Sequence, residues 1–191
     1  MVKKRVIFKL IFKDDAFHLS RNFSLQRAGD TNWLFDKMNF KKISDHIDEL
    51  IILNASKNNS INPLPNFFKK SIEELMRKTF IPLTIGGGLT NLGQIDECFE
   101  LGADKIILTS AVKTCPELID KCSSKYGAQA VSVGIDFKKI DLINKNKKSC
   151  YFSYINNGKD KFMSLNEHIK FIRKFKFGEL MMTSIDMDGT G

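Results

Sequence analysis

Short apolar runs alternate along this chain with segments in which apolar residues recur every three or four positions. The apolar runs predict six strands, at residues 6–12, 49–54, 83–85, 105–108, 130–136 and 180–186. Helical periodicity after the first five strands predicts five helices, at about residues 31–38, 67–78, 92–101, 116–122 and 165–175. The strands are apolar almost throughout, which is typical of buried parallel strands. The alternation therefore predicts a parallel α/β architecture.

Two segments do not fit the alternation. Residues 13–30 are polar and irregular, and this is long for a connection, so we interpret them as a functional loop. Residues 138–157 predict a hairpin excursion, with residues 151–154 as one arm and Asn157-Gly158 as a turn.

Glycine-rich turns recur after several strands, and this favours a (βα)8 TIM-barrel type over a doubly wound sheet. Only about six of the eight βα units are present in the 191 residues, whereas a closed barrel needs eight units and usually about 250 residues. We therefore expect a single partial (βα)8 barrel domain over residues 1–191, either C-terminally truncated or with an open sheet.

The amino-acid composition and the charge reduce the number of functions to consider. The chain is 42% hydrophobic and 27% charged, as ordinary globular proteins are, and its net charge of +8 comes mostly from scattered lysines without an aromatic–basic recognition module. We therefore expect no nucleic-acid partner. No apolar run approaches ~20 residues, so no membrane association is expected. The four cysteines and three histidines show no metal-ligand spacing. We expect no metal, no cofactor and a cytoplasmic location.

Candidate chemistry begins with three consecutive glycines after the strand at 83–85. Gly86-Gly87-Gly88 precede a helix, and Thr109-Ser110 follow the next strand. Loops at the carboxyl ends of parallel strands are where α/β folds bind ligands, and free backbone N–H groups beside a helix start bind anions. We expect a phosphate site here; the alternative for the glycines is a plain tight turn.

Several segments carry a specific resemblance: PLTIGGG, GADKIILTSAV, SVGIDFKK and GELMMTSIDMDGTG. In order and spacing they resemble the cyclase subunit of imidazole glycerol phosphate synthase, the HisF family. The resemblance spans essentially the whole chain and is strongest from Pro82 onward. It implies a barrel that docks a HisH-like glutaminase on its N-terminal face. Ammonia would cross the barrel core and attack a phosphorylated small-molecule substrate, a ribulosyl phosphate, at the C-terminal face.

The resemblance assigns acid–base catalysis to two carboxylates, of which only one is present. Asp136 matches one member of the pair, but Ile11 stands where the other aspartate belongs. Leu19 likewise replaces a substrate-contacting lysine. Because an alkyl side chain cannot transfer a proton, the cyclase activity is in question. Asp14 or Asp15 could substitute only with a rearranged loop.

The remaining site residues also come from the resemblance. The ammonia inlet is implied at four charged residues that precede strands, namely Arg5, Glu49, Lys105 and Glu179. One phosphate-binding corner is implied at Gly87, Gly88, Thr109 and Ser110, and a second begins at Asp188-Gly189. Thr183 fits a substrate contact or a small residue that lets side chains pack inside the barrel.

Three functional interpretations remain open. The first is a genuine cyclase subunit of histidine biosynthesis. The second is a paralogous ammonia conduit, which lacks the first aspartate and works with a glutaminase and a sugar amidotransferase in surface-polysaccharide biosynthesis. The third is an inactive gene fragment. The kept inlet and the broken carboxylate pair favour the second.

Overall fold

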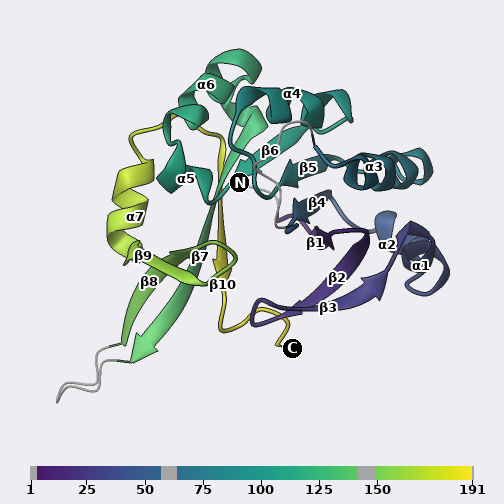
Figure 1. Ribbon diagram of the computed structural model, residues 1–191, viewed down its shortest axis with the longest axis horizontal. Helices are drawn as coiled ribbons and strands as arrows, with labels where there is room; N and C mark the ends of the chain where they lie inside the picture. The colour runs from purple at the N-terminus through teal and green to yellow at the C-terminus, as the bar shows by residue number, and fades with distance from the viewer. Residues whose placement is uncertain (1–3, 57–63, 142–148, 191) are drawn as a thin grey trace. The chain divides into compact units, whose positions relative to one another are not determined.

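The computed structural model describes residues 4–56, 64–141 and 149–190. The chain forms two compact units. Unit 1 comprises Met1–Leu19 and Leu25–Ile107, and unit 2 comprises Ser20–Ser24 and Leu108–Gly191. Figure 1 labels the elements of both.

Unit 1 is built on parallel strands in the order β1 (Ile7–Lys13), β4 (Glu49–Asn54), β5 (Leu83–Gly86) and β6 (Lys105–Leu108). All four confirm predicted strands. Leu50 of β4 lies between Phe8 and Leu83 of its neighbours. Every residue of β5 is buried, which explains why the sequence of this strand lacks apolar–polar alternation.

Helices α1 (Thr31–Asp36), α2 (Phe40–Ser44), α3 (Asn66–Lys78) and α4 (Leu92–Glu100) connect these strands. Asp30 caps α1, with its side chain accepting from the Trp33 N–H at 2.9 Å. The predicted helix over 31–38 ends at Asp36 in the structure, and α2, which was not predicted, begins after Asn39, which adopts a left-handed conformation (φ 52°). Cys98 of α4 is a buried free thiol, and burial raises its pKa to about 12, so the thiol stays protonated.

The prediction of an irregular loop over 13–30 is wrong. These residues form β2 (Ala16–Arg21) and β3 (Ser24–Gly29), and β2 pairs antiparallel with β1. Asp14 turns the chain with a φ of 58°, and the Phe17 ring then packs edge-on against Phe12 at 5.4 Å. Burial of Ala16 and Phe17 at its start fixes a strand whose remaining residues are partly or fully exposed, and the periodicity of the sequence does not reveal this.

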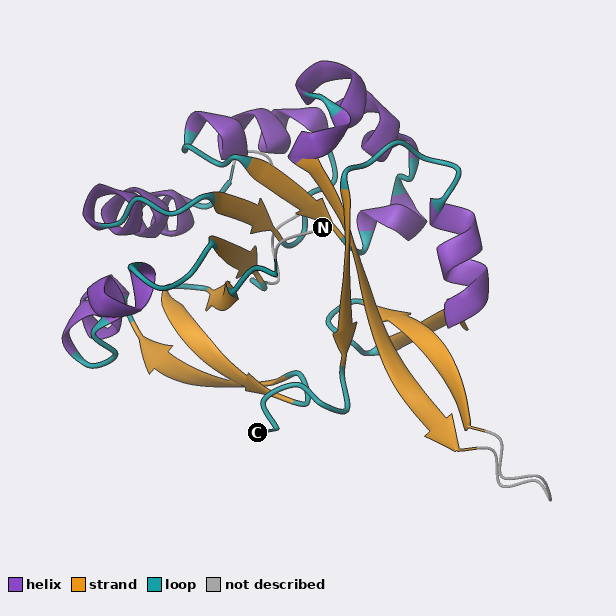
Figure 2. Cartoon of the chain, turned by 180° about the vertical axis from the view of Figure 1, so that it is seen from behind, coloured by secondary structure: helices purple, strands orange, loops and turns teal. Residues whose placement is uncertain are grey.

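Unit 2 centres on β7 (Val131–Asp141), which pairs in parallel with β10 (Glu179–Ser184). On its other side β7 pairs antiparallel with β8 (Ser149–Ile155), and β8 with β9 (Asp160–Ser164). The predicted hairpin is thus confirmed; the residues that join β7 to β8 lie outside the described part of the chain. Figure 2 shows β7 and β8 as a long ribbon.

The helices of unit 2 are α5 (Ala111–Thr114), α6 (Glu117–Tyr126), the 3-10 turn Ala128–Ala130 and α7 (Leu165–Ile172). The short helix α5 was not predicted, and Phe175 lies beyond the end of α7. Ser164 and Glu167 form a capping box at the start of α7. His168 is buried against the Phe162 ring at 5.2 Å, and burial lowers its pKa to about 4.

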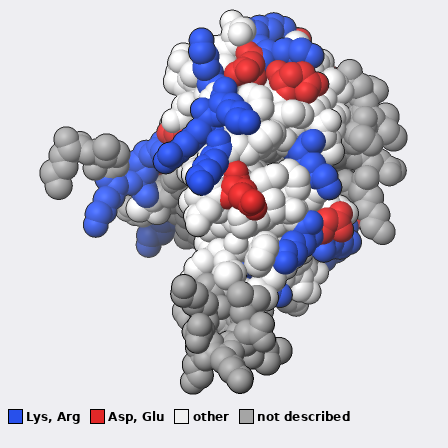
Figure 3. Space-filling view, turned by 90° about the vertical axis from the view of Figure 1, so that its left-hand side faces the viewer, with Lys and Arg blue, Asp and Glu red and all other residues white. Residues whose placement is uncertain are grey.

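Parallel strands joined by helices, with a hairpin after β7, make this an α/β fold of the incomplete (βα)8 TIM-barrel type. Whether residues 1–191 act as one domain stays a prediction. Among the described residues, no helix is long and apolar enough to cross a membrane. On the face drawn in Figure 3, basic side chains lie in several groups with acidic side chains among them.

Candidate functional site

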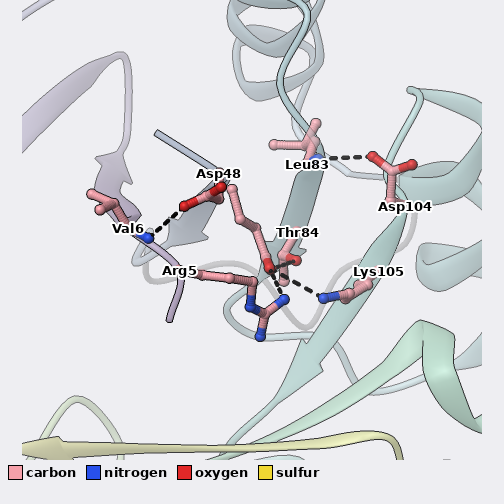
Figure 4. A network of polar contacts seen from close by, with 8 residues as sticks. Arg5, Val6, Asp48, Leu83, Thr84, Asp104 and Lys105 are labelled. Carbon is pink, nitrogen blue, oxygen red and sulfur yellow. Dashed lines mark hydrogen bonds and ion pairs between the residues drawn. The ribbon is translucent and has the colours of Figure 1, made fainter. Parts of the chain in front are cut away.

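Three of the four predicted inlet residues meet in unit 1 around the carboxylate of Glu49. Arg5 Nη1 lies 2.9 Å and Lys105 Nζ 3.1 Å from the same Glu49 oxygen, Oε2. The hydroxyl of Thr84 donates to the other oxygen, Oε1, at 2.6 Å. Figure 4 shows the side chains converging from the starts of β1, β4, β5 and β6. Both carboxylate oxygens are therefore held by named donors.

Local sequence fixes this arrangement by anchoring the strand starts. Asp48, one residue before β4, accepts the Val6 N–H at 2.8 Å. Asp104, one residue before β6, accepts the Leu83 N–H at 2.8 Å. Each carboxylate ties the start of one strand to the next, so the charged side chains that follow are brought to a common edge.

The electrostatics of the Glu49 cluster (Arg5, Glu49, Thr84 and Lys105) follow from burial. Glu49 is only 3% exposed, so its charge requires partners, and two cations and a hydroxyl supply them. The three charged groups sum to +1. Sequence reasoning missed Thr84; a single polar residue inside the buried apolar run Leu83–Ile85 was the available signal.

The fourth predicted inlet residue, Glu179, belongs to unit 2. It opens β10 and is the register partner of Ser132 in β7. A ring of all four residues therefore stays a prediction, of which unit 1 assembles three members.

Unit 2 brings together two predicted site residues at the other end of its parallel strands. Asp136 in β7 is the register partner of Thr183 in β10 and, on its other side, of Tyr154 in β8. All three side chains are partly exposed. A carboxylate flanked by two hydroxyl groups can exchange protons with a bound molecule. Tyr154 was not among the predicted site residues, although its position in the predicted hairpin arm was the available signal.

The glycine loop of unit 1 has a backbone that other residues cannot adopt without strain. Gly87 and Gly88 have φ values of 92° and 70°. A Cβ on Gly87 would lie 2.2 Å from the backbone oxygen of Asn54, at the end of β4. The loop passes directly over the end of the neighbouring strand, so glycine at this position is required by both conformation and space.

The other predicted phosphate contacts lie in unit 2. Thr109 and Ser110 lead into α5, and the Ser110 hydroxyl receives the Asn156 N–H at 3.4 Å. The Asp188 carboxylate accepts from the Ser20 hydroxyl at 2.5 Å and from the Phe23 N–H at 3.1 Å. Asp188 thus ties the end of the described chain to the turn between β2 and β3.

Known proteins with similar sequences identify the family of this chain. A family model described as "Histidine biosynthesis protein" matches residues 45–191. A protein of Parasynechococcus marenigrum named "Putative imidazole glycerol phosphate synthase subunit hisF2" is 39% identical over 193 residues, covering 100% of this chain and 68% of the relative. The HisF subunit of Chlorobium phaeovibrioides is 32% identical (100% and 71% covered), and that of Staphylococcus carnosus 31% (99% and 70%). The chain belongs to the HisF family.

Within this HisF-family fold, Ile11 lies inside β1, which has a strand on each side. It lies between Leu53 of β4 and His18 of β2, so its immediate strand neighbours offer no carboxylate. Leu19, where the resemblance implies a lysine, lies in β2 with its side chain 52% exposed. This chain therefore has alkyl side chains at the two positions where the family resemblance implies a catalytic aspartate and a substrate-contacting lysine.

Neither acidic neighbour of Ile11 takes the place of the missing aspartate in this HisF-family chain. Asp14 forms the turn after β1, where its N–H donates to the Ser56 hydroxyl at 2.7 Å. Asp15 is exposed and forms an ion pair with Arg27 of β3 at 3.5 Å. The hairpin that replaces the expected loop holds both residues beyond the end of the strand.

Proposed function

We propose that this chain is a HisF-family subunit that receives ammonia from a partner glutaminase and serves as an ammonia conduit rather than as a complete cyclase. The observation that carries the proposal is the Glu49 cluster. Its charged side chains are fixed at the edge where the parallel strands begin, which is the face at which the family resemblance implies an ammonia inlet.

The chemistry of the Glu49 cluster suits a neutral amine. Ammonia carries a lone pair that can accept a hydrogen bond from an Arg or Lys donor. Ammonium has no lone pair with which to accept such a hydrogen bond, and its positive charge is repelled by the neighbouring Arg5 and Lys105. Because Thr84 and the two cations already hold Glu49, its carboxylate is poorly available to bind ammonium.

The destination of the ammonia is the second part of the proposal. We propose a sugar amidotransferase of surface-polysaccharide biosynthesis as the acceptor. The support is the combination of a kept inlet with Ile11 and Leu19, which resembles the paralogues that lack the first catalytic aspartate. In this role Asp136 needs no proton-transfer partner across the strands.

A genuine histidine-pathway cyclase is the second candidate. It is favoured by Asp136 beside Thr183 and by the strained Gly87-Gly88 loop, since both belong to the substrate side of the family resemblance. The two candidates differ in one measurable property: the cyclase makes an imidazole product from the ribulosyl phosphate substrate, and the conduit does not.

The test uses this chain purified together with the glutaminase subunit encoded in the same genome. We expect a complex with glutamine-dependent release of ammonia, and no imidazole product from the ribulosyl phosphate substrate with either glutamine or ammonium salts. In a version that carries all eight βα units, Ile11→Asp restores the missing carboxylate and should give measurable turnover. The control Ile11→Asn introduces a side chain of nearly the same shape as aspartate, but asparagine transfers no proton, so this variant should give no turnover. Robust turnover by the unmodified chain, or no complex with the glutaminase, would contradict the proposal.

A further inference from the structure

His18 lies beside Ile11, the position at which the family resemblance implies a catalytic aspartate. The two residues are register partners in the antiparallel pair formed by β1 and β2. Directly opposed residues of paired strands point to the same side of the sheet. The hairpin that replaces the expected loop therefore brings an imidazole next to the alkyl side chain of Ile11.

The packing of the adjacent residues shows which side of the sheet His18 faces. Phe12 and its register partner Phe17 lie on the side that the helices cover, because the Phe12 ring is 5.3 Å from the ring of Phe68 in α3. Side chains alternate between the two sides along a strand. Ile11 and His18 therefore face the side opposite to the helices.

The Glu49 cluster occupies this same side of the sheet, at the starts of the strands. Glu49 is the register partner of Ile7, which lies four residues before Ile11 in β1. Four residues of a strand span about 13 Å. The proposed ammonia inlet and His18 therefore lie about this far apart along one face of the unit 1 sheet.

The imidazole of His18 is oriented as a base requires. Its Nδ1 lies 3.1 Å from the backbone oxygen of Ala16. A carbonyl oxygen only accepts hydrogen bonds, so Nδ1 carries the proton and Nε2 of the neutral ring carries the lone pair. His18 is partly exposed, and no residue in the described part of the chain forms a hydrogen bond with Nε2. This atom can therefore receive a proton from a bound molecule.

The glycine loop begins on the same row of paired residues. Ile11 pairs with Leu53 of β4, and Leu53 pairs with Gly86 of β5. The next two residues, Gly87-Gly88, are those at which the sequence predicts phosphate binding. A phosphorylated molecule at this loop would lie on the row of strands that ends at His18.

We propose that His18 is the proton acceptor when ammonia attacks a carbonyl group of a phosphorylated small molecule bound at this face. The nitrogen lone pair of ammonia forms a bond to the carbonyl carbon, and the electrons of the C=O π bond move to the oxygen. One proton passes from the nitrogen to Nε2 of His18 and from there to the oxygen. The product is a carbinolamine that contains every atom of both reactants.

A single proton-transfer group fits this addition better than it fits ring closure, which the family resemblance assigns to two carboxylates. The inference rests on the proposed function only for the supply of ammonia. It goes beyond that function because it gives the chain one chemical step of its own. It also agrees with the expectation that the chain forms no imidazole product.

The experiment supplies isotopically labelled ammonium chloride and ribulose phosphate, a phosphorylated ketose, to the purified chain without a glutaminase. A carbinolamine loses water to give an imine, and cyanoborohydride in the assay reduces the imine to a stable amine. Mass spectrometry measures the rate at which the labelled amine forms. We expect the unmodified chain to form it at least about tenfold faster than the same mixture without protein.

Two variants test the role of the imidazole. His18→Asn keeps an amide N–H that can donate to Ala16, but its side chain is not basic, so the protein-dependent rate should fall at least about tenfold. The matched control is His46→Ala, which removes an exposed histidine from the turn before β4. This control should stay within about twofold of the unmodified chain. Circular dichroism should show the same fold for both variants.

Added imidazole separates proton transfer from a purely structural role. His18→Ala leaves room for a free imidazole molecule in place of the side chain, so imidazole in the buffer should raise the rate of this variant at least about fivefold. The asparagine of His18→Asn fills part of that space. The same addition should therefore change the rate of His18→Asn by less than about twofold.

Three results would overturn the inference: no rate above background for the unmodified chain, an undiminished rate in His18→Asn, or no response of His18→Ala to imidazole. Because the assay contains no glutaminase, each of these results leaves the proposed conduit in place. A chain that passes this assay but forms no complex with the glutaminase would contradict the proposed function alone.

Discussion

Replacing Glu49 by glutamine tests whether the ion pairs of the Glu49 cluster stabilise the fold. The substitution keeps the shape of the side chain and removes its charge, so Arg5 and Lys105 lose the counter-charge that lies 2.9 and 3.1 Å away. The Arg5 side chain is 39% exposed and the Lys105 side chain 19%, so lysine is the more dependent on Glu49.

The magnitude follows from distance and exposure. At 3.1 Å two unit charges attract by about 5 kcal/mol at an effective dielectric constant of about 20, and by about 1 kcal/mol in bulk water. Removal of one partner from a fully buried pair costs about 3–5 kcal/mol, and water at Arg5 lowers this figure. We therefore expect Glu49→Gln to reduce the free energy of unfolding by about 2–3 kcal/mol.

The assay is urea unfolding followed by circular dichroism for four proteins: unmodified, Glu49→Gln, Lys105→Met and the double variant. The double variant should be less unstable than the sum of the single variants by about 1–2 kcal/mol, because both single variants remove the same attraction between Glu49 and Lys105, and the sum counts it twice. Additive single effects would refute the reasoning, since they would mean that Glu49 and Lys105 do not interact. A Glu49→Gln protein as stable as the unmodified chain would refute it as well.

Two further predictions concern strain and pH. Gly87→Ala should lower the free energy of unfolding by at least about 2 kcal/mol more than Gly102→Ala. Both glycines have φ above 90°, but only a Cβ on Gly87 would collide with Asn54. Chemical denaturation measures both variants, and equal losses of unfolding free energy would contradict the close approach of Gly87 to Asn54. Burial lowers the pKa of His168 from 6.5 to about 4. As the pH falls, the unfolded chain therefore binds a proton at His168 before the folded chain does. The free energy of unfolding should be full above pH 6.5 and should fall by about 2 kcal/mol by pH 5. In His168→Leu the stability, followed as the Tm, should not fall over this pH range. A fall in this variant would exclude His168 as the cause.

The strands and most helices were predictable because their signals are local. Runs such as residues 49–54 are apolar enough to require burial on both faces. The caps Asp30, Asn91 and Ser164 each accept from a backbone N–H only three residues further along the chain. The turn between β8 and β9 was predictable for the same reason, since Asn157-Gly158 tolerate positive φ. The charged residues before the strands could be named from the sequence as well.

What the sequence by itself determined is therefore the α/β alternation, the family resemblance, and the alkyl residues Ile11 and Leu19 where the resemblance implies a catalytic aspartate and a substrate-contacting lysine. The tertiary structure alone decided the β2–β3 hairpin and the part of Thr84 in holding Glu49. Each of these depends on residues far apart in the chain: Phe17 needs Phe12 and the β1 register, and Glu49 lies 35 positions before Thr84 and 56 before Lys105. Periodicity reports whether a residue is buried, but only packing decides which distant side chain becomes its neighbour.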